Sequence, residues 1–233
     1  MFNTQHILCM AISAVVTALL LFLAAKWLKT QKQKDDFLKF FAVLTVLLHY
    51  SDLWVDYFLT GGNAYITSVH LLPVYPCNVM MWMLLIGALM KDKHSFAFRT
   101  ISEFCFYVGI VCGVVGIAFN INFDNTPTLA DYSVLKGLLS HSTLLVGCIY
   151  FKVGNYFTVR PGNALSVTLG TAVFLVCGVG VNRLYDHFGM ESPDGMFLRH
   201  NPYFSCSPIV PSICVIGVMY MILLLIQQRK RKR

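Results

Sequence analysis

Long apolar runs alternate with short polar segments along almost the whole chain. Seven runs are long enough to cross a hydrocarbon core of roughly 30 Å as α-helices. We predict spans at about residues 7–25, 37–60, 73–90, 96–119, 134–151, 164–182 and 207–226. The connecting segments are too short for a soluble domain. The pattern therefore predicts one all-α integral membrane domain, residues 1–233, folded as a seven-transmembrane-helix bundle.

Composition and charge placement agree with this prediction. The chain is 57% hydrophobic and 12% charged, with a mean hydropathy of +0.65, which leaves too few charges to cover a water-facing surface. The net charge is +7, and 15 of the 18 Lys and Arg residues lie between spans 1 and 2, 3 and 4, or 5 and 6, or in the C-terminal tail. By the positive-inside rule, the N-terminus is outside and the C-terminus is cytoplasmic. The basic residues thus indicate topology, and we expect no nucleic-acid partner.

Intramembrane polar residues are the candidates for function, because a membrane helix tolerates few of them. His49, Asp52 and Asp56 are spaced i, i+3, i+7 in LLHYSDLWVDYFLT and share one helix face. We expect Asp52 and Asp56 to pair structurally with Arg183 or a tyrosine.

We also predict a polar pocket in the outer half of the membrane. His141 is the only other histidine inside a predicted span, and Asn182 and Arg183 end the sixth span at its outer side. With the predicted topology, five sequence regions supply the pocket: Asp52, Asp56, Cys77, His141 and Asn182.

The stretch LLPVYPCNVMMW predicts a cysteine at a helix N-terminus. Proline is accepted at the first helical position, so Pro76 can begin the helix and place Cys77 in its first turn, followed by Asn78. The positive end of the helix dipole and free backbone N–H groups there favour a thiolate. His141 is the best-placed base, and Asp52 or Asp56 could orient it. The alternative is that Cys77 packs as a small hydrophobic side chain.

The other cysteines give little support for disulfides. The chain has eight cysteines and no CxxC pair, and six of the eight fall inside predicted spans. Only Cys77 and Cys206 lie near the outer boundary, and a bridge between them stays open at the level of sequence.

Two other classes of function deserve comparison with a cysteine enzyme. A zinc hydrolase needs about three convergent histidines, and the seventh predicted span has none, so we expect no metal and no cofactor. A non-enzymatic transporter or ligand-binding protein could use His49, Asp52 and Asp56 as a proton or cation relay. Pro- or Gly-broken helices in both halves would favour transport, and no such break is seen in the last three spans.

Several segments resemble the YwaF-like integral membrane proteins. These segments are LLPVYPCNVMMWMLLIGALM, FYVGIVCGVVGIAF, LKGLLSHSTLLVGCIYF and VNRLYDHFGMESPDGMFLRHNP. Tyr75 stands where the family signature commonly has histidine, and Ser142 replaces a glycine after His141.

That family extends to a vertebrate TMEM-type acyltransferase that places polyunsaturated acyl chains on ether phospholipids. The resemblance implies acyl transfer or acyl hydrolysis on membrane lipids, with Cys77 as nucleophile and His141 as its partner. It favours the bacterial cytoplasmic membrane over a eukaryotic endomembrane.

Overall fold

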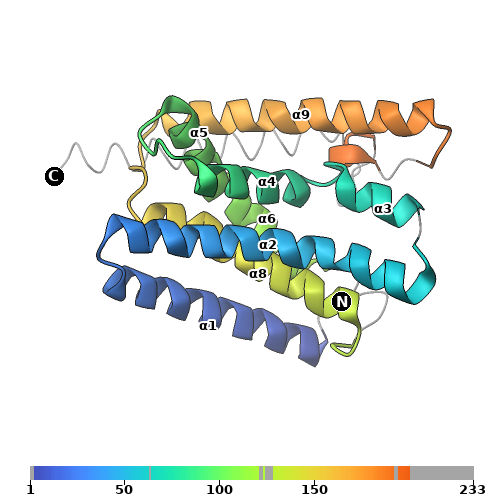
Figure 1. The fold of residues 1–233 in the computed structure, drawn as a ribbon, viewed down its shortest axis with the longest axis horizontal. Helices are drawn as coiled ribbons and strands as arrows, with labels where there is room; N and C mark the ends of the chain where they lie inside the picture. Colours follow the sequence, from blue (N-terminus) through green and yellow to red (C-terminus); the bar gives the residue numbers. More distant parts are fainter. Residues whose placement is uncertain (1–2, 63, 121–122, 124–127, 192–193, 200–233) are drawn as a thin grey trace.

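The computed structural model describes residues 3–62, 64–120, 123, 128–191 and 194–199, and all regular structure in these ranges is helical. Its elements, labelled as in Figure 1, are α1 (Thr4–Trp27), α2 (Gln31–Thr60), α3 (Ala64–Leu71), α4 (Pro76–Leu89), α5 (Phe96–Phe104), the π-helical turn η1 (Cys105–Gly109), α6 (Ile110–Ala118), α8 (Tyr132–Val153), α9 (Asn163–His187) and the 3₁₀ turn η2 (Gly195–Phe197). The predicted all-α class is confirmed.

Five helices in the described part of the chain are long and apolar enough to cross a membrane. They are Thr4–Trp27, Gln31–Leu59, Phe96–Ala118, Tyr132–Val153 and Asn163–His187. The predicted span 73–90 is a shorter apolar helix of 14 residues, α4, and the predicted span 207–226 lies outside the described residues. The N-outside orientation stays a prediction.

Local sequence explains where several helices begin and end. Asn3 caps α1 by accepting a hydrogen bond from the backbone N–H of His6. Thr30 and Gln33 form a reciprocal capping box at the start of α2. The same helix ends at Gly61, whose φ of 77° is in the left-handed region that glycine adopts without steric cost.

Helix α8 lies at the centre of the fold and is the most buried of the five long helices. It packs against α1, α2, α4 and the α5–η1–α6 segment, while α9 packs on α5 (Figure 1). Glycines allow the close approach of α6, because Gly113 lies against the backbone of His141 and Leu145 on α8. The glycines at 109, 113 and 116 therefore form a helix-packing surface against α8.

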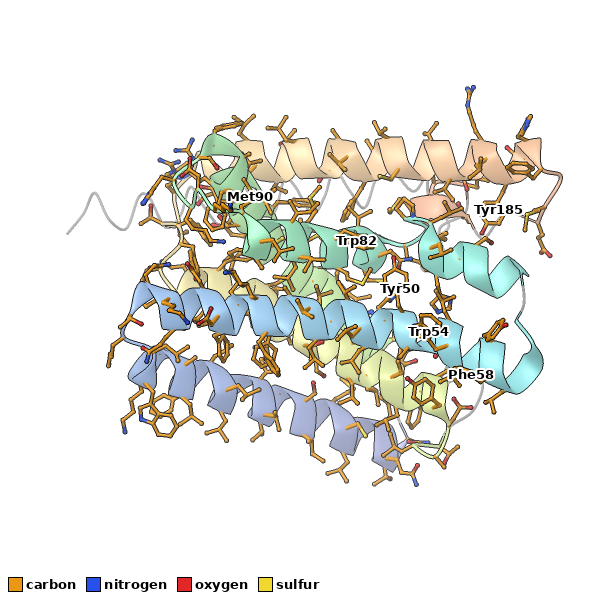
Figure 2. All side chains as sticks on the ribbon, viewed as in Figure 1. Tyr50, Trp54, Phe58, Trp82, Met90 and Tyr185 are labelled. Atoms are coloured by element: carbon orange, nitrogen blue, oxygen red, sulfur yellow. The ribbon has the colours of Figure 1, made fainter. Side chains whose placement is uncertain are left out.

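Large apolar side chains also cover the outside of the bundle. Trp54 and Phe58 on α2 and Trp82 on α4 are among them, and all three are exposed (Figure 2). Exposed apolar surface is typical of proteins that contact lipid or another protein. The helical surface therefore matches a protein whose solvent is lipid.

Candidate functional site

Helix α4 begins where the sequence predicts. Tyr75 is its N-cap residue in extended conformation, Pro76 takes the first helical position, and Cys77 lies in the first turn. The half-buried thiol of Cys77 donates a weak hydrogen bond to Asn78 Oδ1, with Sγ and Oδ1 3.4 Å apart. The first turn of α4 therefore presents a half-buried thiol engaged in a weak hydrogen bond.

Asn78 joins this thiol to the preceding short helix. Its Nδ2 donates to the carbonyl oxygens of Val69 and Leu72, at 3.2 and 3.1 Å. Val69 lies in the last turn of α3 and Leu72 directly follows the helix, where intrahelical partners run out. Asn78 therefore fixes α3 against the start of α4 and holds the first turn around Cys77.

His141 is oriented by its own helix. Its Nδ1 lies 2.7 Å from the carbonyl oxygen of Gly137, one turn earlier in α8, so Nδ1 carries the proton that it donates. The second ring nitrogen, Nε2, then keeps its lone pair and can accept a proton. The ring lies against Gly116 of α6, where a Cβ atom would overlap the imidazole. Gly116 and Gly137 together therefore set the position and the tautomer of His141.

The predicted thiol and imidazole meet at one small cavity between α2, α4 and α8. Its volume is about 10 Å³, near the minimum needed for one water molecule. The lining residues are Thr45, His49, Cys77, Met81, Ser140, His141 and Leu144. Helix packing therefore brings three predicted site residues, Cys77, His141 and His49, to one place, and their catalytic roles stay predictions.

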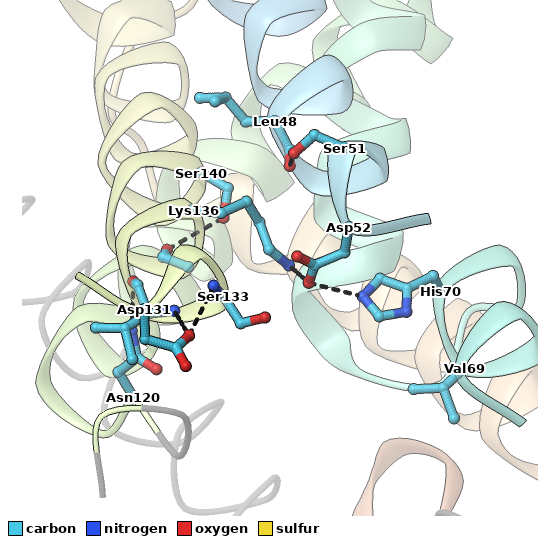
Figure 3. A network of polar contacts seen from close by, with 12 residues as sticks. Leu48, Ser51, Asp52, Val69, His70, Asn120, Asp131, Ser133, Lys136 and Ser140 are labelled. Atoms are coloured by element: carbon cyan, nitrogen blue, oxygen red, sulfur yellow. Dashed lines mark hydrogen bonds and ion pairs between the residues drawn. The ribbon is translucent and has the colours of Figure 1, made fainter. Parts of the chain in front are cut away.

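Asp52 does not serve the role that its sequence position suggested. Its carboxylate forms an ion pair with Lys136 of α8, and its Oδ2 lies 3.2 Å from Nε2 of His70 on α3 (Figure 3). The expectation that Asp52 orients His141 or pairs with Arg183 is wrong, because Lys136 and His70 reach its carboxylate first. Arg183 is exposed on α9, and the side chain of Asp56 lies outside the described residues.

Lys136 is buried as a consequence. Only 8% of its side chain is exposed. A buried ammonium must be neutralised by a partner, and the carboxylate of Asp52 supplies it.

His49 stands between this ion pair and the cavity. Its ring centroid is 5.6 Å from that of His70 and 5.3 Å from that of Tyr50. Its Nε2 is buried and has no hydrogen-bond partner among the described residues. A buried ring nitrogen without a partner costs free energy, which makes His49 the least satisfied polar group of the site.

Asn182 lies on α9 and holds the turn η2 in place. Its Oδ1 accepts a hydrogen bond of 2.7 Å from the backbone N–H of Gly195 in η2. The backbone N–H of the next residue, Met196, donates to the carbonyl oxygen of Val74, just before α4. Asn182 is not among the residues that line the cavity of Cys77 and His141, and its predicted place in a larger polar pocket stays a prediction.

Two histidines that the sequence places outside the spans are structural. His6 is fully buried in α1, and its Nε2 is 2.9 Å from the carbonyl oxygen of Ile117. His70 lies in α3, a helix that the hydrophobic pattern does not separate from the neighbouring loop. Asn3, a helix-capping residue three positions before His6, is the signal that could have placed His6 inside a helix.

Thr45 and Ser140 are cavity residues that the sequence prediction missed. Thr45 precedes His49 by one turn of α2, and Ser140 directly precedes His141. Their spacing from the predicted residues is the signal that could have placed them at the cavity. Cys206, the possible disulfide partner of Cys77, lies outside the described residues. Among the described residues, no three His, Cys, Asp or Glu side chains are grouped as a metal site would require.

Comparison with known proteins identifies the family of the chain. Residues 1–229, nearly the full length, match the model of the TMEM164 family. No curated protein and no solved structure matches the chain. The matching family is TMEM164, and this match does not confirm the resemblance to the YwaF-like proteins. The chain has helices long enough to span a membrane, and the family model covers almost its whole length. It therefore belongs to the TMEM164 family.

Proposed function

We propose that the protein is a membrane-embedded enzyme that transfers or hydrolyses the acyl groups of phospholipids through Cys77 and His141. The observation that carries this proposal is their shared cavity: α4 and α8 are separate in sequence, yet each supplies one chemically active side chain to it. A nucleophile and a base on one small cavity are the minimum required for covalent acyl transfer.

In the first step, Nε2 of His141 takes the proton of the Cys77 thiol. The Nδ1–H of the same ring stays bonded to the carbonyl oxygen of Gly137, which holds the imidazolium in place. The thiolate then attacks the carbonyl carbon of an acyl ester, and the π electron pair moves to the oxygen. When the carbonyl re-forms, the ester C–O bond breaks, and the departing alkoxide takes the proton from His141.

In the second step, the hydroxyl group of an acceptor takes the acyl group from Cys77, and the proton transfers run in the opposite direction. The acceptor gives its proton to Nε2 of His141 and attacks the thioester carbon, and Cys77 leaves as a thiolate that regains the proton. A lysophospholipid hydroxyl gives acyl transfer, whereas water gives hydrolysis. The two reactions share the same acyl-cysteine, so the acceptor that reaches the cavity distinguishes them.

The surroundings of the cavity support a lipid substrate. Tyr50 and Trp82 pack together across α2 and α4, with ring centroids 5.8 Å apart. They are the chain neighbours of His49 and Met81, which line the cavity, and Trp82 is 40% exposed on the outer surface (Figure 2). The cavity itself accommodates little more than one oxygen atom, so we place only the reacting carbonyl there and the acyl chain along the α2–α4 surface.

The test is to detect the acyl-enzyme directly. The full-length protein in lipid nanodiscs is incubated with a phospholipid carrying an isotope-labelled acyl chain and a lysophospholipid acceptor, and intact-protein mass spectrometry follows a hydroxylamine-sensitive adduct. We expect the adduct in the parent and in Cys112→Ala, which removes a half-buried cysteine of α6. Cys77→Ala should lose it, and His141→Gln should slow its formation by about 10²–10⁴-fold. An adduct that persists in Cys77→Ala would refute the proposed nucleophile.

A proton or cation relay is the second candidate, and the buried Asp52–Lys136 pair with His70 favours it (Figure 3). Ionisable groups buried between the helices of a membrane protein commonly serve transport. A pH-sensitive dye in proteoliposomes would report proton flux. A relay requires flux that Asp52→Asn abolishes and Cys77→Ala leaves intact, and the absence of flux in the parent would exclude it.

A further inference from the structure

We propose that His49 is a third catalytic residue, whose Nε2–H donates a hydrogen bond to the substrate carbonyl oxygen and stabilises the oxyanion formed when Cys77 attacks. This inference rests on the proposed acyl chemistry and assigns a role that Cys77 and His141 do not fill. An acyl-transfer site needs donors for the oxyanion as well as a nucleophile and a base.

The hydroxyl groups around the cavity are already occupied. The hydroxyl oxygen of Thr45 lies 2.7 Å from the carbonyl oxygen of Phe41 and 3.0 Å from Oγ1 of Thr143. The hydroxyl of Ser140 donates to the carbonyl oxygen of Gly137 at 3.1 Å. Neither hydroxyl therefore has a spare proton to offer a substrate oxygen.

The backbone at the start of α4 offers fewer donors than a helix N-terminus usually does. Pro76 has no N–H group. The N–H of Asn78 donates to the carbonyl oxygen of Tyr75, with N and O 3.0 Å apart. The N–H of Cys77 is left as the donor in the first turn, and oxyanion sites commonly use at least two donors.

His49 supplies the missing donor. Its Nε2 is buried, has no hydrogen-bond partner among the described residues, and belongs to a ring that lines the cavity with Cys77 and His141. The cavity has room for about one oxygen atom, which matches a carbonyl oxygen in size. An unpaired nitrogen on a ring that lines a space of that size gains a partner when a substrate oxygen fills the space, and most strongly when that oxygen becomes charged.

The ring contacts of His49 also explain how the side chain is held while Nε2 has no partner among the described residues. The ring packs between Tyr50 and His70, and His70 is fixed in turn by the carboxylate of Asp52 (Figure 3). The buried Asp52–Lys136 pair thereby holds His70 in place, and His70 in turn positions the ring of His49 at the cavity. A rigid donor that awaits the transition state needs no reorganisation during the reaction.

The experiment compares His49→Phe, His49→Gln and the control Ser51→Ala in nanodiscs. Ser51 is on the same helix, and its hydroxyl donates to the carbonyl oxygen of Leu48 rather than to the cavity. Acyl transfer from a labelled phospholipid gives kcat and KM, iodoacetamide alkylation of Cys77 reports thiolate formation, and thermal unfolding reports Tm.

We expect His49→Phe to lower kcat by about 10²–10³-fold, as loss of an oxyanion donor does elsewhere. KM, the alkylation rate and its pH profile should stay at the parent values, because His141 still activates the thiol. Tm should be equal or higher, since a buried unpaired nitrogen has been removed. His49→Gln, which keeps a side-chain N–H donor, should recover part of kcat, and Ser51→Ala should match the parent.

Three results would overturn the assignment. Unchanged kcat in His49→Phe would mean that His49 is not a donor, while the acyl-enzyme of the parent would still support the proposed function. Alkylation slowed as much as in His141→Gln would make His49 a base for the thiol. A parent protein that forms no acyl adduct at all would instead remove the proposed function and this role of His49 with it.

Discussion

The ammonium of Lys136 on α8 is paired with the carboxylate of Asp52 on α2, and their side chains are only 8% and 12% exposed. This ion pair joins two helices that pack against each other at the centre of the bundle. Since His70 shares the same carboxylate, the pair also ties α3 to the bundle beside the cavity. Its removal is therefore a test of how the site is held together.

Replacing Lys136 by methionine should lower the free energy of unfolding by about 3–5 kcal/mol, because it leaves the Asp52 carboxylate buried without its cation. Reversible unfolding in detergent micelles measures the change. The control is Lys32→Met, which breaks a pair with Asp36 whose side chains are 86% and 53% exposed, and should leave Tm unchanged. Equal effects of the two substitutions would contradict a structural role for the buried pair.

Gly116→Ala should damage both stability and catalysis. A Cβ atom at this position would overlap the imidazole of His141, and the hydrogen bond to Gly137 prevents an easy rotation of that ring. We expect a loss of about 1–3 kcal/mol in unfolding free energy, as for other overpacked cores, together with slower acyl-enzyme formation. In contrast, Gly180→Ala should fold and react normally, because no atom lies within 4 Å of the added Cβ.

Asn182→Ala should release the segment around η2. The change removes the acceptor of the Gly195 N–H bond, and we expect a cost of about 1–3 kcal/mol for the unpaired buried group. Hydrogen exchange at residues 194–199 should accelerate. Arg183→Ala provides the matched control, since the neighbouring side chain is exposed and its removal should leave exchange as in the parent.

Ser166→Ala tests the packing of α9 on α5. The hydroxyl of Ser166 donates to Oε2 of Glu103 at 2.5 Å, and the Glu103 side chain is 2% exposed. Without this donor, the buried oxygen loses its hydrogen bond, at a cost of about 1–3 kcal/mol. Thr168→Ala on the same helix removes a hydroxyl that bonds only within α9, and it should be close to neutral in thermal unfolding.

Local features of the chain were predictable because short-range chemistry sets them. Apolar runs place the membrane helices, and Pro76 begins α4 with Cys77 in its first turn. The glycines of α6 mark a close helix contact in the same way. Each of these depends on residues within a turn or two of one another, so the linear sequence contains the necessary information.

Contacts between distant segments could not be predicted from local sequence in this way. The sequence determined which polar side chains lie on long apolar helices, but the register between α2 and α8 decided that Asp52 meets Lys136 rather than His141. The same packing left the ring of His49 at the cavity with an unpaired nitrogen. Periodicity fixes the face on which a side chain lies, whereas its partner depends on how far each helix slides along its neighbour, which only the tertiary structure decides.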